Sequence, residues 1–211
     1  MVGRATARVA PDVVDVLLRV RAERRRRTDV TEEISRRSEA LRMVLDEAGA
    51  AIGTRATTAV QIVPTNPGRS TDRGFAAEQT VQCEVREISA FPEIVGRAVE
   101  LANAEVQLVG HRVDEANPAA LDACQRAAED ARRRALAYAA GSGVRLAGLA
   151  WAREPARNEY FTSGARTMVA QSIARGASVE ASSHIDLSGD ILTISVELEA
   201  AFTFTPDEPT E

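Results

Sequence analysis

The chain has 211 residues, 45% hydrophobic and 27% charged, so it is long and apolar enough to build a sizeable core, which argues against wholesale disorder. Its formal net charge of −5 argues against general affinity for nucleic acid or anionic membranes, which needs a basic surplus or a segregated basic face. Only 4% of residues are aromatic, so small aliphatic side chains must fill the core, and this disfavours a roomy small-molecule pocket.

Two strands and a helix are predicted in the first fifty residues. Apolar and polar residues alternate over 5–9 and again over 14–20, and Pro11 marks a bend between the two strands. Thr31 is placed to cap a helix whose apolar face runs over 34–48. The chain therefore begins as strand, strand, helix.

The middle of the chain is predicted to form short strands separated by one loop and one helix, because alternating stretches are interrupted once by turn residues and once by a helical period. The predicted elements are a strand over 55–63 stopped by Pro64, a loop over 65–74, a strand over 81–85, a helix over 89–103 and a strand over 105–113. Strands on either side of a helix favour a split βαβ arrangement.

A long alanine-rich helix is predicted over 118–140. Asn117 supplies a capping side chain and Pro118 suits the first helical position. We expect Arg132, Arg133 and Arg134 to stay solvated. The stripe predicted to pack against the sheet consists of Leu121, Cys124, Ala128, Ala131, Ala135 and Tyr138.

The last third of the chain contains its clearest strand. A strand is expected over 144–153, whereas 154–180 lacks a clean period and is predicted to be a variable insertion with a short helix over 167–174. Seven apolar residues alternate with mostly polar ones over 192–204, which predicts a long strand. Residues 206–211 are expected to be a flexible acidic tail.

This order of elements predicts the α+β class: a largely antiparallel sheet, about three helices, and a split βαβ-like core to which the long helix and the C-terminal strands are added. We find no convincing internal repeat or interdomain linker. The sequence therefore predicts one domain over 1–205.

Four segments, taken together, resemble the SIMPL domain family in their order and spacing. The resemblance covers nearly the whole chain except 154–180, which falls where the family tends to vary. The segments are the strand pair of 3–20 around Ala10-Pro11-Asp12, the helix with Ala40, Leu41, Val44, Leu45 and Gly49 followed by a strand closing on Pro64, the alanine-rich stretch 123–143, and the C-terminal strand entered through Gly189-Asp190.

The resemblance implies an α+β fold and includes members that assemble into large rings, but it supplies no agreed reaction and no catalytic residues. Many bacterial members are secreted to the cell envelope and linked to stress responses. This sequence departs from them because it shows no leader, and no stretch approaches the roughly 18 apolar residues of a membrane span. We therefore expect a cytoplasmic protein with no membrane insertion.

Neither a metal, a cofactor nor a catalytic site is predicted. His111 and His184 are the only histidines, and each lacks companion ligands at a suitable spacing. Cys83 and Cys124 fall on apolar stripes and are expected to be buried thiols. No phosphate-binding loop is found, and the serines close to Asp186 lack a nucleophile elbow, so we expect no enzymatic activity.

Seven residues are candidates for interaction with a partner. One reading of the arginine run is a solvated connection paired with nearby carboxylates, and the other is a surface for an acidic partner or nucleic acid, although no nucleic-acid function is predicted overall. The aromatic candidates lie in or beside the variable segment. The seven are Arg24, Arg25, Arg26, Arg27, Trp151, Tyr160 and Phe161.

The leading hypothesis is a non-enzymatic interaction or scaffold protein that forms a homo-oligomer, with a ring-like assembly and a stress-related role suggested by the resemblance alone. The long final strand and the alanine stripe are the features that favour assembly, although core burial explains both as well. The alternative is a small-ligand-binding or envelope-stress factor acting through 153–175. A third class, a metal-dependent hydrolase using His111 or His184, has the least support.

Overall fold

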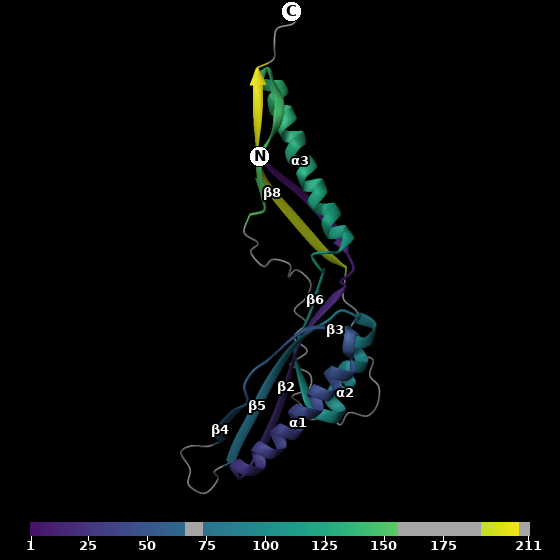
Figure 1. Cartoon of the computed structure of the whole chain (residues 1–211), viewed down its shortest axis with the longest axis vertical. Helices are drawn as coiled ribbons and strands as arrows, with labels where there is room; N and C mark the ends of the chain where they lie inside the picture. Colours follow the sequence, from purple (N-terminus) through teal and green to yellow (C-terminus); the bar gives the residue numbers. More distant parts are fainter. Residues whose placement is uncertain (66–73, 156–190, 207–211) are drawn as a thin grey trace, which may run out of the picture. The chain divides into compact units, whose positions relative to one another are not determined.

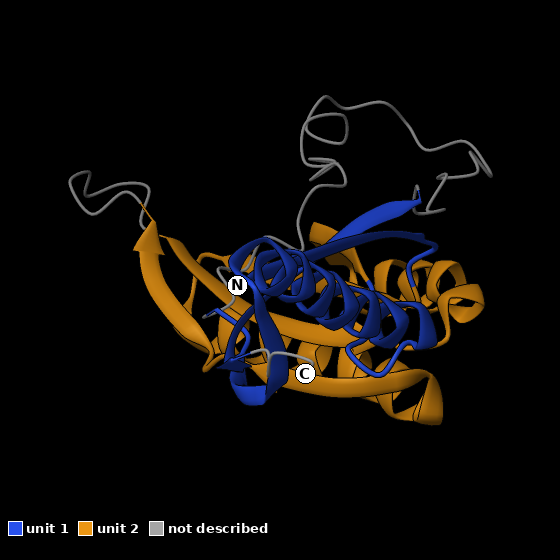
Figure 2. Cartoon of the chain, turned by 90° about the horizontal axis from the view of Figure 1, so that it is seen from above, with its two compact units in different colours: residues 1–11, 113–164, 189–211 blue, residues 12–112, 165–188 orange. Residues whose placement is uncertain are grey.

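The computed structural model describes residues 1–65, 74–155 and 191–206, which form two compact units (Figure 2). Unit 1 combines 1–11 with 113–155 and 191–206, and unit 2 consists of 12–65 and 74–112. Each unit pairs antiparallel strands with helices, which confirms the predicted α+β class. The strands divide between two sheets, whereas the sequence prediction placed them in one.

Three α-helices and eight strands make up the described chain (Figure 1). Two short 3₁₀ turns, Gly49–Ala51 and Ile88–Ala90, adjoin the first two helices. The strands and helices are β1 (Val2–Val9), β2 (Val13–Arg24), α1 (Arg27–Glu47), β3 (Ile52–Thr57), β4 (Gln61–Thr65), β5 (Gly74–Val85), α2 (Phe91–Ala102), β6 (Ala104–Arg112), α3 (Pro118–Ser142), β7 (Val144–Arg153) and β8 (Leu192–Pro206).

Unit 2 has the predicted split βαβ arrangement. Its sheet runs in the order β3-β5-β2-β6, with β4 also paired to β5, and every pair is antiparallel. β5 thus lies between β2 and β3, the two strands that α1 connects. Alternate residues of β2, from Val14 to Val20, are fully buried together with apolar residues of α1 and α2. The apolar residues that recur at every second position in the sequence therefore form the core-facing side of this strand.

Unit 1 is one long helix on a three-stranded sheet of order β1-β8-β7. The central strand β8 pairs with β1 over 192–199 and with β7 over 199–206. Figure 1 shows α3 running alongside these strands. Asn117 caps the helix as predicted, its side chain accepting a hydrogen bond from the backbone N–H of Ala119 at 2.8 Å. Gly143 ends the helix in the left-handed conformation, with φ of 64°.

The face of α3 that packs on the sheet differs from the predicted stripe. Ala131 and Ala135 are buried as expected and Cys124 is half-buried, but Leu121, Ala128 and Tyr138 are exposed. Arg132, Arg133 and Arg134 are exposed, as predicted. The residues of α3 that are buried are Ala120, Ala123, Ala127, Asp130, Ala131, Ala135 and Ala139.

The physical reason for this shift is the closeness of α3 to β1. A Cβ atom built on Gly3 would stand 1.9 Å from the carbonyl oxygen of Ala127 and 2.8 Å from the Cβ of Ala131. At this separation only glycine on the strand and alanine on the helix fit. Larger apolar side chains of α3 are therefore excluded from the contact, even though they are more hydrophobic.

Three local predictions were wrong in position. α1 begins at Arg27, so Thr31 lies inside the helix, where its hydroxyl donates to the carbonyl of Arg27 at 2.8 Å instead of capping the N-terminus. The strand predicted over 55–63 is two strands, β3 and β4. Pro64 lies within β4, an outer strand of its sheet, where a missing N–H is tolerated.

The prediction of one domain over 1–205 stays a prediction. Two compact units with separate apolar clusters can still unfold in one cooperative transition. The insertion predicted over 154–180 and the acidic tail lie almost wholly outside the described residues.

We expect Gly3→Ala to destabilise the protein by about 2 kcal/mol or more, because the new methyl group collides with the backbone of α3. Gly96→Ala in α2 is the matched control. Beyond its chain neighbours and the backbone of its own helix, no described atom lies within 4 Å of a Cβ at that position, and alanine favours the helix by about 1 kcal/mol. Urea unfolding of both variants measures the difference, and equal effects would contradict the close contact.

Ala131→Leu should overpack the same contact and lower the free energy of unfolding by about 1–3 kcal/mol. Arg132→Ala, one residue along the helix on the exposed side, should change it by about 0.5 kcal/mol or less. The two urea midpoints give the comparison. A larger loss from the arginine substitution would show that the face of α3 assigned to the sheet is the wrong one.

Candidate functional site

The arginine run lies where β2 ends and α1 begins. Arg24 is within 3.5 Å of Glu33, as the solvated reading expected. The next three arginines are exposed, and no ion pair joins them to any described residue. Arg26 and Arg27 also occupy the N-terminus of α1, where the helix dipole disfavours positive charge. Neutralisation by neighbouring carboxylates therefore accounts for Arg24 and not for Arg25, Arg26 or Arg27.

Trp151 is an exposed residue of β7, and the guanidinium carbon of Arg153 lies 5.5 Å from the centroid of its ring. That arginine also pairs with Glu199 across the strands at 2.6 Å. The structure thus holds the tryptophan on the sheet surface by a cation–π contact. Tyr160 and Phe161 lie outside the described residues, as does most of the segment 153–175.

The open edge of β1 is capped by side chains of α3. The backbone N–H of Arg4 points away from β8 and donates to Oδ2 of Asp130 at 3.1 Å. Two residues along, the carbonyl oxygen of Thr6 accepts a hydrogen bond from Arg126 at 3.1 Å. Edge groups with side-chain partners are poor templates for another strand. Strand addition at β1 is therefore disfavoured.

Asp130 is the centre of this capping arrangement and one of two buried acidic residues in the described chain. The hydrogen bond from the Arg4 backbone, followed by those from Arg133 and Arg134, holds the pKa of its carboxyl below the usual value of 3.8, against the opposing effect of burial. Sequence reasoning missed this residue. Its signal is an acidic side chain on a stripe otherwise made of alanine.

The other outer strand of unit 1, β7, is protected in a different way. Its register with β8 shifts twice, between Leu146 and Gly148 and between Leu149 and Trp151. Such bulges increase the local twist and interrupt the regular row of backbone groups. Side-chain packing is therefore a more favourable mode of association for this unit than the addition of a strand.

Large apolar side chains are exposed where the sheet of unit 1 has only two strands. β1 pairs with β8 as far as residue 199 and Met1 hydrogen-bonds to Ala200, whereas over 201–206 β7 is the one described strand that pairs with β8. We call this region, residues 136–151 and 201–206, the two-strand end. Its exposed large apolar residues are Leu136, Tyr138, Leu149, Trp151 and Phe204.

The final strand and the alanine stripe, which favoured assembly in the sequence, have partners within the chain. β8 is the central strand of its sheet, and the buried alanines of α3 pack on that sheet. Sequence reasoning identified Trp151 in the two-strand end because aromatic residues are scarce, but it missed Leu149 and Phe204. These lie on alternating strands, where a buried position was the ordinary expectation.

The described residues offer little catalytic equipment. No group of three or more His, Cys, Asp or Glu side chains in these ranges is placed to hold a metal ion. His111 lies on β6, and His184 is outside the described residues. Burial raises the pKa of the Cys83 thiol to about 11, so it stays protonated and unreactive near neutral pH. Cys124 is half-buried on α3.

Comparisons with known proteins give one extensive match. The sequence model of the SIMPL family, described as a protein of unknown function (DUF541), matches residues 1–202. No curated protein matches the chain. None of the helices in the described ranges is long and apolar enough to cross a membrane.

Solved structures resemble the chain only distantly. Two structures of AtUAH, in complex with (S)-hydroxyglycine and with glyoxylate, are 10% identical with a TM-score of 0.32, and the match covers 51% of this chain and 29% of theirs. A de novo designed protein, Foldit4, is 19% identical with a TM-score of 0.26, over 48% of this chain and 98% of its own. The chain thus spans under a third of AtUAH, and similarity at these scores carries no functional argument.

We expect Asp130→Asn to lower stability at neutral pH and to lose that effect in acid. Because the folded-state pKa of Asp130 lies below 3.8, the charged carboxyl stabilises the fold above that pH, and its contribution disappears as the pH falls through the folded value. Urea unfolding at pH 7 and pH 2 tests this. Asp122→Asn, an exposed residue of α3 paired with Arg126, should show little effect at either pH.

Proposed function

Since the chain belongs to the SIMPL family, we propose that it is a non-enzymatic scaffold protein that works as a homo-oligomer, with the two-strand end of unit 1 as its self-association surface. Ring assembly among family members, implied by the resemblance, agrees with this proposal. The observation that carries it is the exposure of large apolar side chains in the two-strand end, where the strand register puts Leu149 and Phe204 on one face of the sheet. Exposed apolar surface of this kind on a folded protein is characteristic of interaction sites.

The composition of the two-strand end supports burial against a protein partner. Tyr138, Trp151 and Phe204 are three exposed aromatic residues in a chain with only 4% aromatic residues. Tyrosine and tryptophan are enriched among the residues that contribute most to binding at protein interfaces. Leu149, with 59% of its surface exposed, adds an aliphatic contact. A second copy supplies a matching apolar surface by symmetry.

The protection of both outer strands of unit 1 disfavours association by strand pairing. β1 is capped by Asp130 and Arg126, and β7 is bulged, so neither edge favours a continuous sheet between copies. We therefore propose contact through side chains. The stress-related role, the cytoplasmic location and the ligand-binding alternative in 153–175 stay predictions.

Light scattering coupled to size-exclusion chromatography, over a range of protein concentrations, tests the proposal. Wild-type protein should be a defined oligomer, and Leu149→Ser combined with Phe204→Ser should shift it toward the monomer, because both side chains are already exposed in the single chain and their loss mainly affects the interface. A wild-type protein that is monomeric at every concentration would contradict self-association.

The matched control is Met43→Ser combined with Leu101→Ser. Both residues are 51% exposed, against 59% and 40% for Leu149 and Phe204, and they lie on α1 and α2 of unit 2. This pair should leave the oligomer unchanged. An oligomer that the control disrupts as strongly as the two-strand-end pair would place the interface elsewhere.

A further inference from the structure

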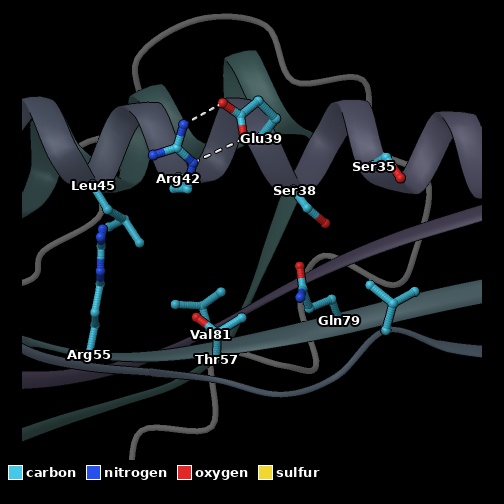
Figure 3. A pocket seen from close by; sticks show the side chains of 10 residues that line it. Ser35, Ser38, Glu39, Arg42, Leu45, Arg55, Thr57, Gln79 and Val81 are labelled. Carbon is cyan, nitrogen blue, oxygen red and sulfur yellow. Dashed lines mark hydrogen bonds and ion pairs between the residues drawn. The ribbon is translucent and has the colours of Figure 1, made fainter.

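Unit 2 contains a cavity between α1 and the strands β3 and β5 (Figure 3). Its volume is about 380 Å³, within the range of about 300–1,000 Å³ typical of small-molecule sites. Five residues come from α1, two from β3, two from β5, and Val60 from the link between β3 and β4. The sequence, with its few aromatic residues, did not suggest a pocket here.

Short side chains on the flank of α1 create this space. Ser35, Ser38 and Arg42 follow one another at three- and four-residue steps, so they share one side of the helix. Figure 3 shows Ser38 pointing from the helix toward Gln79 on β5, with a gap between the two walls. The Oγ atom of Ser38 is buried and has no hydrogen-bond partner. The side chains of α1 and of the two strands therefore leave the space between them unfilled.

One end of the cavity carries a chain of alternating charges. Glu39 pairs with Arg42, which pairs with Asp46 at 2.8 Å, and Asp46 pairs with Arg55 at 2.6 Å. Arg42 and Asp46 each have two partners of opposite charge, and both oxygens of Glu39 accept from Arg42. Arg55 has only one, through Nη1, so its Nε and Nη2 are free of described partners. This series of charges therefore ends at the guanidinium group of Arg55, whose Nε and Nη2 edge is open.

The remaining lining is apolar in the middle and neutral at the far end. Leu45 and Val81 are buried side chains that form part of the wall, and the exposed Val60, on the link between β3 and β4, adds to the lining. Glu39 and Asp46 balance the charges of the two arginines, so a ligand here is held by hydrogen bonds from Arg55 and not by a net positive charge, which disfavours a strongly hydrated dianion such as phosphate. One carboxylate is enough to occupy the open edge of Arg55. A carboxylate suits the planar edge of a guanidinium because it accepts two parallel hydrogen bonds.

We propose that this cavity binds a small monocarboxylate with a short apolar chain, whose carboxylate pairs with Arg55. Its apolar chain lies against Leu45 and Val81. This site is independent of the self-association surface, because all of its residues belong to unit 2. It gives the protein a second property, the binding of a small organic acid.

Titration of ¹⁵N-labelled full-length protein with hexanoate, followed by backbone amide NMR shifts, tests the site. Hexanoate should bind with a Kd of about 1 mM and shift amides in 35–45, 55–60 and 79–81. Acetate lacks the apolar chain and 1-hexanol lacks the charge, so each should bind at least about tenfold more weakly. No saturable shift with hexanoate, or equal affinity for 1-hexanol, would overturn the proposal.

Substitutions test whether hexanoate binds in this cavity. Arg55→Gln should weaken hexanoate about tenfold. Arg97→Gln is the matched control, since Arg97 also pairs with one carboxylate in unit 2 and is exposed to 38% against 41% for Arg55, but it does not line the cavity. The control should bind like the wild type. Unchanged affinity in Arg55→Gln, or an equal loss in Arg97→Gln, would exclude recognition by Arg55.

Ser38→Leu provides a second test that does not alter charge. Leucine should occupy the cavity and replace the unpartnered hydroxyl, so the melting temperature should stay the same or rise while hexanoate binding is lost. A folded Ser38→Leu protein that binds hexanoate like the wild type would show that the ligand lies elsewhere. If this variant does not fold, the comparison of Arg55→Gln with Arg97→Gln still decides.

Discussion

The contact between Gly3 of β1 and the alanine face of α3 is the constraint on which unit 1 depends. Because the helix backbone lies directly against the strand, nothing larger than a methyl group fits between Ala127 or Ala131 and the sheet. The same closeness lets Asp130 and Arg126 reach the backbone of β1 and cap its edge. It also leaves the larger apolar residues of α3 outside. Tight packing on one face of the helix and exposed apolar side chains elsewhere thus have a common cause.

Much of the fold could be predicted because its signals are local and periodic. Alternation identified β2 and β8, and Asn117 and Gly143 marked the ends of α3, since caps act within a few residues. The buried face of α3 could not be assigned by hydrophobicity, because the distance between helix and sheet decides it and that distance depends on a glycine far away in the sequence. Recurrent alanines over 120–139 were the only usable signal.

The candidate sites were harder to predict for related reasons. The sequence identified the arginine run and Trp151 from composition, but an unpaired charge is recognised only when the positions of all neighbouring carboxylates are known. The cavity beside α1 depends on the distance between this helix and the strands β3 and β5, and the sequence pattern of neither wall indicates that distance. Leu149 and Phe204 belong to a β7–β8 register that shifts twice, and no local pattern encodes which of these alternating residues is exposed.

The place of β8 between β1 and β7 has a consequence for the order in which the protein acquires its structure during synthesis. All strands of unit 2 lie within 13–112, so their pairing can be complete while the ribosome is still adding residues. β1 is made before the strands of unit 2 but has no strand partner until 192–199 emerge. β1 therefore waits for a strand that is made after the whole of unit 2, and the sheet of unit 1 can be completed only once every strand of unit 2 has left the ribosome.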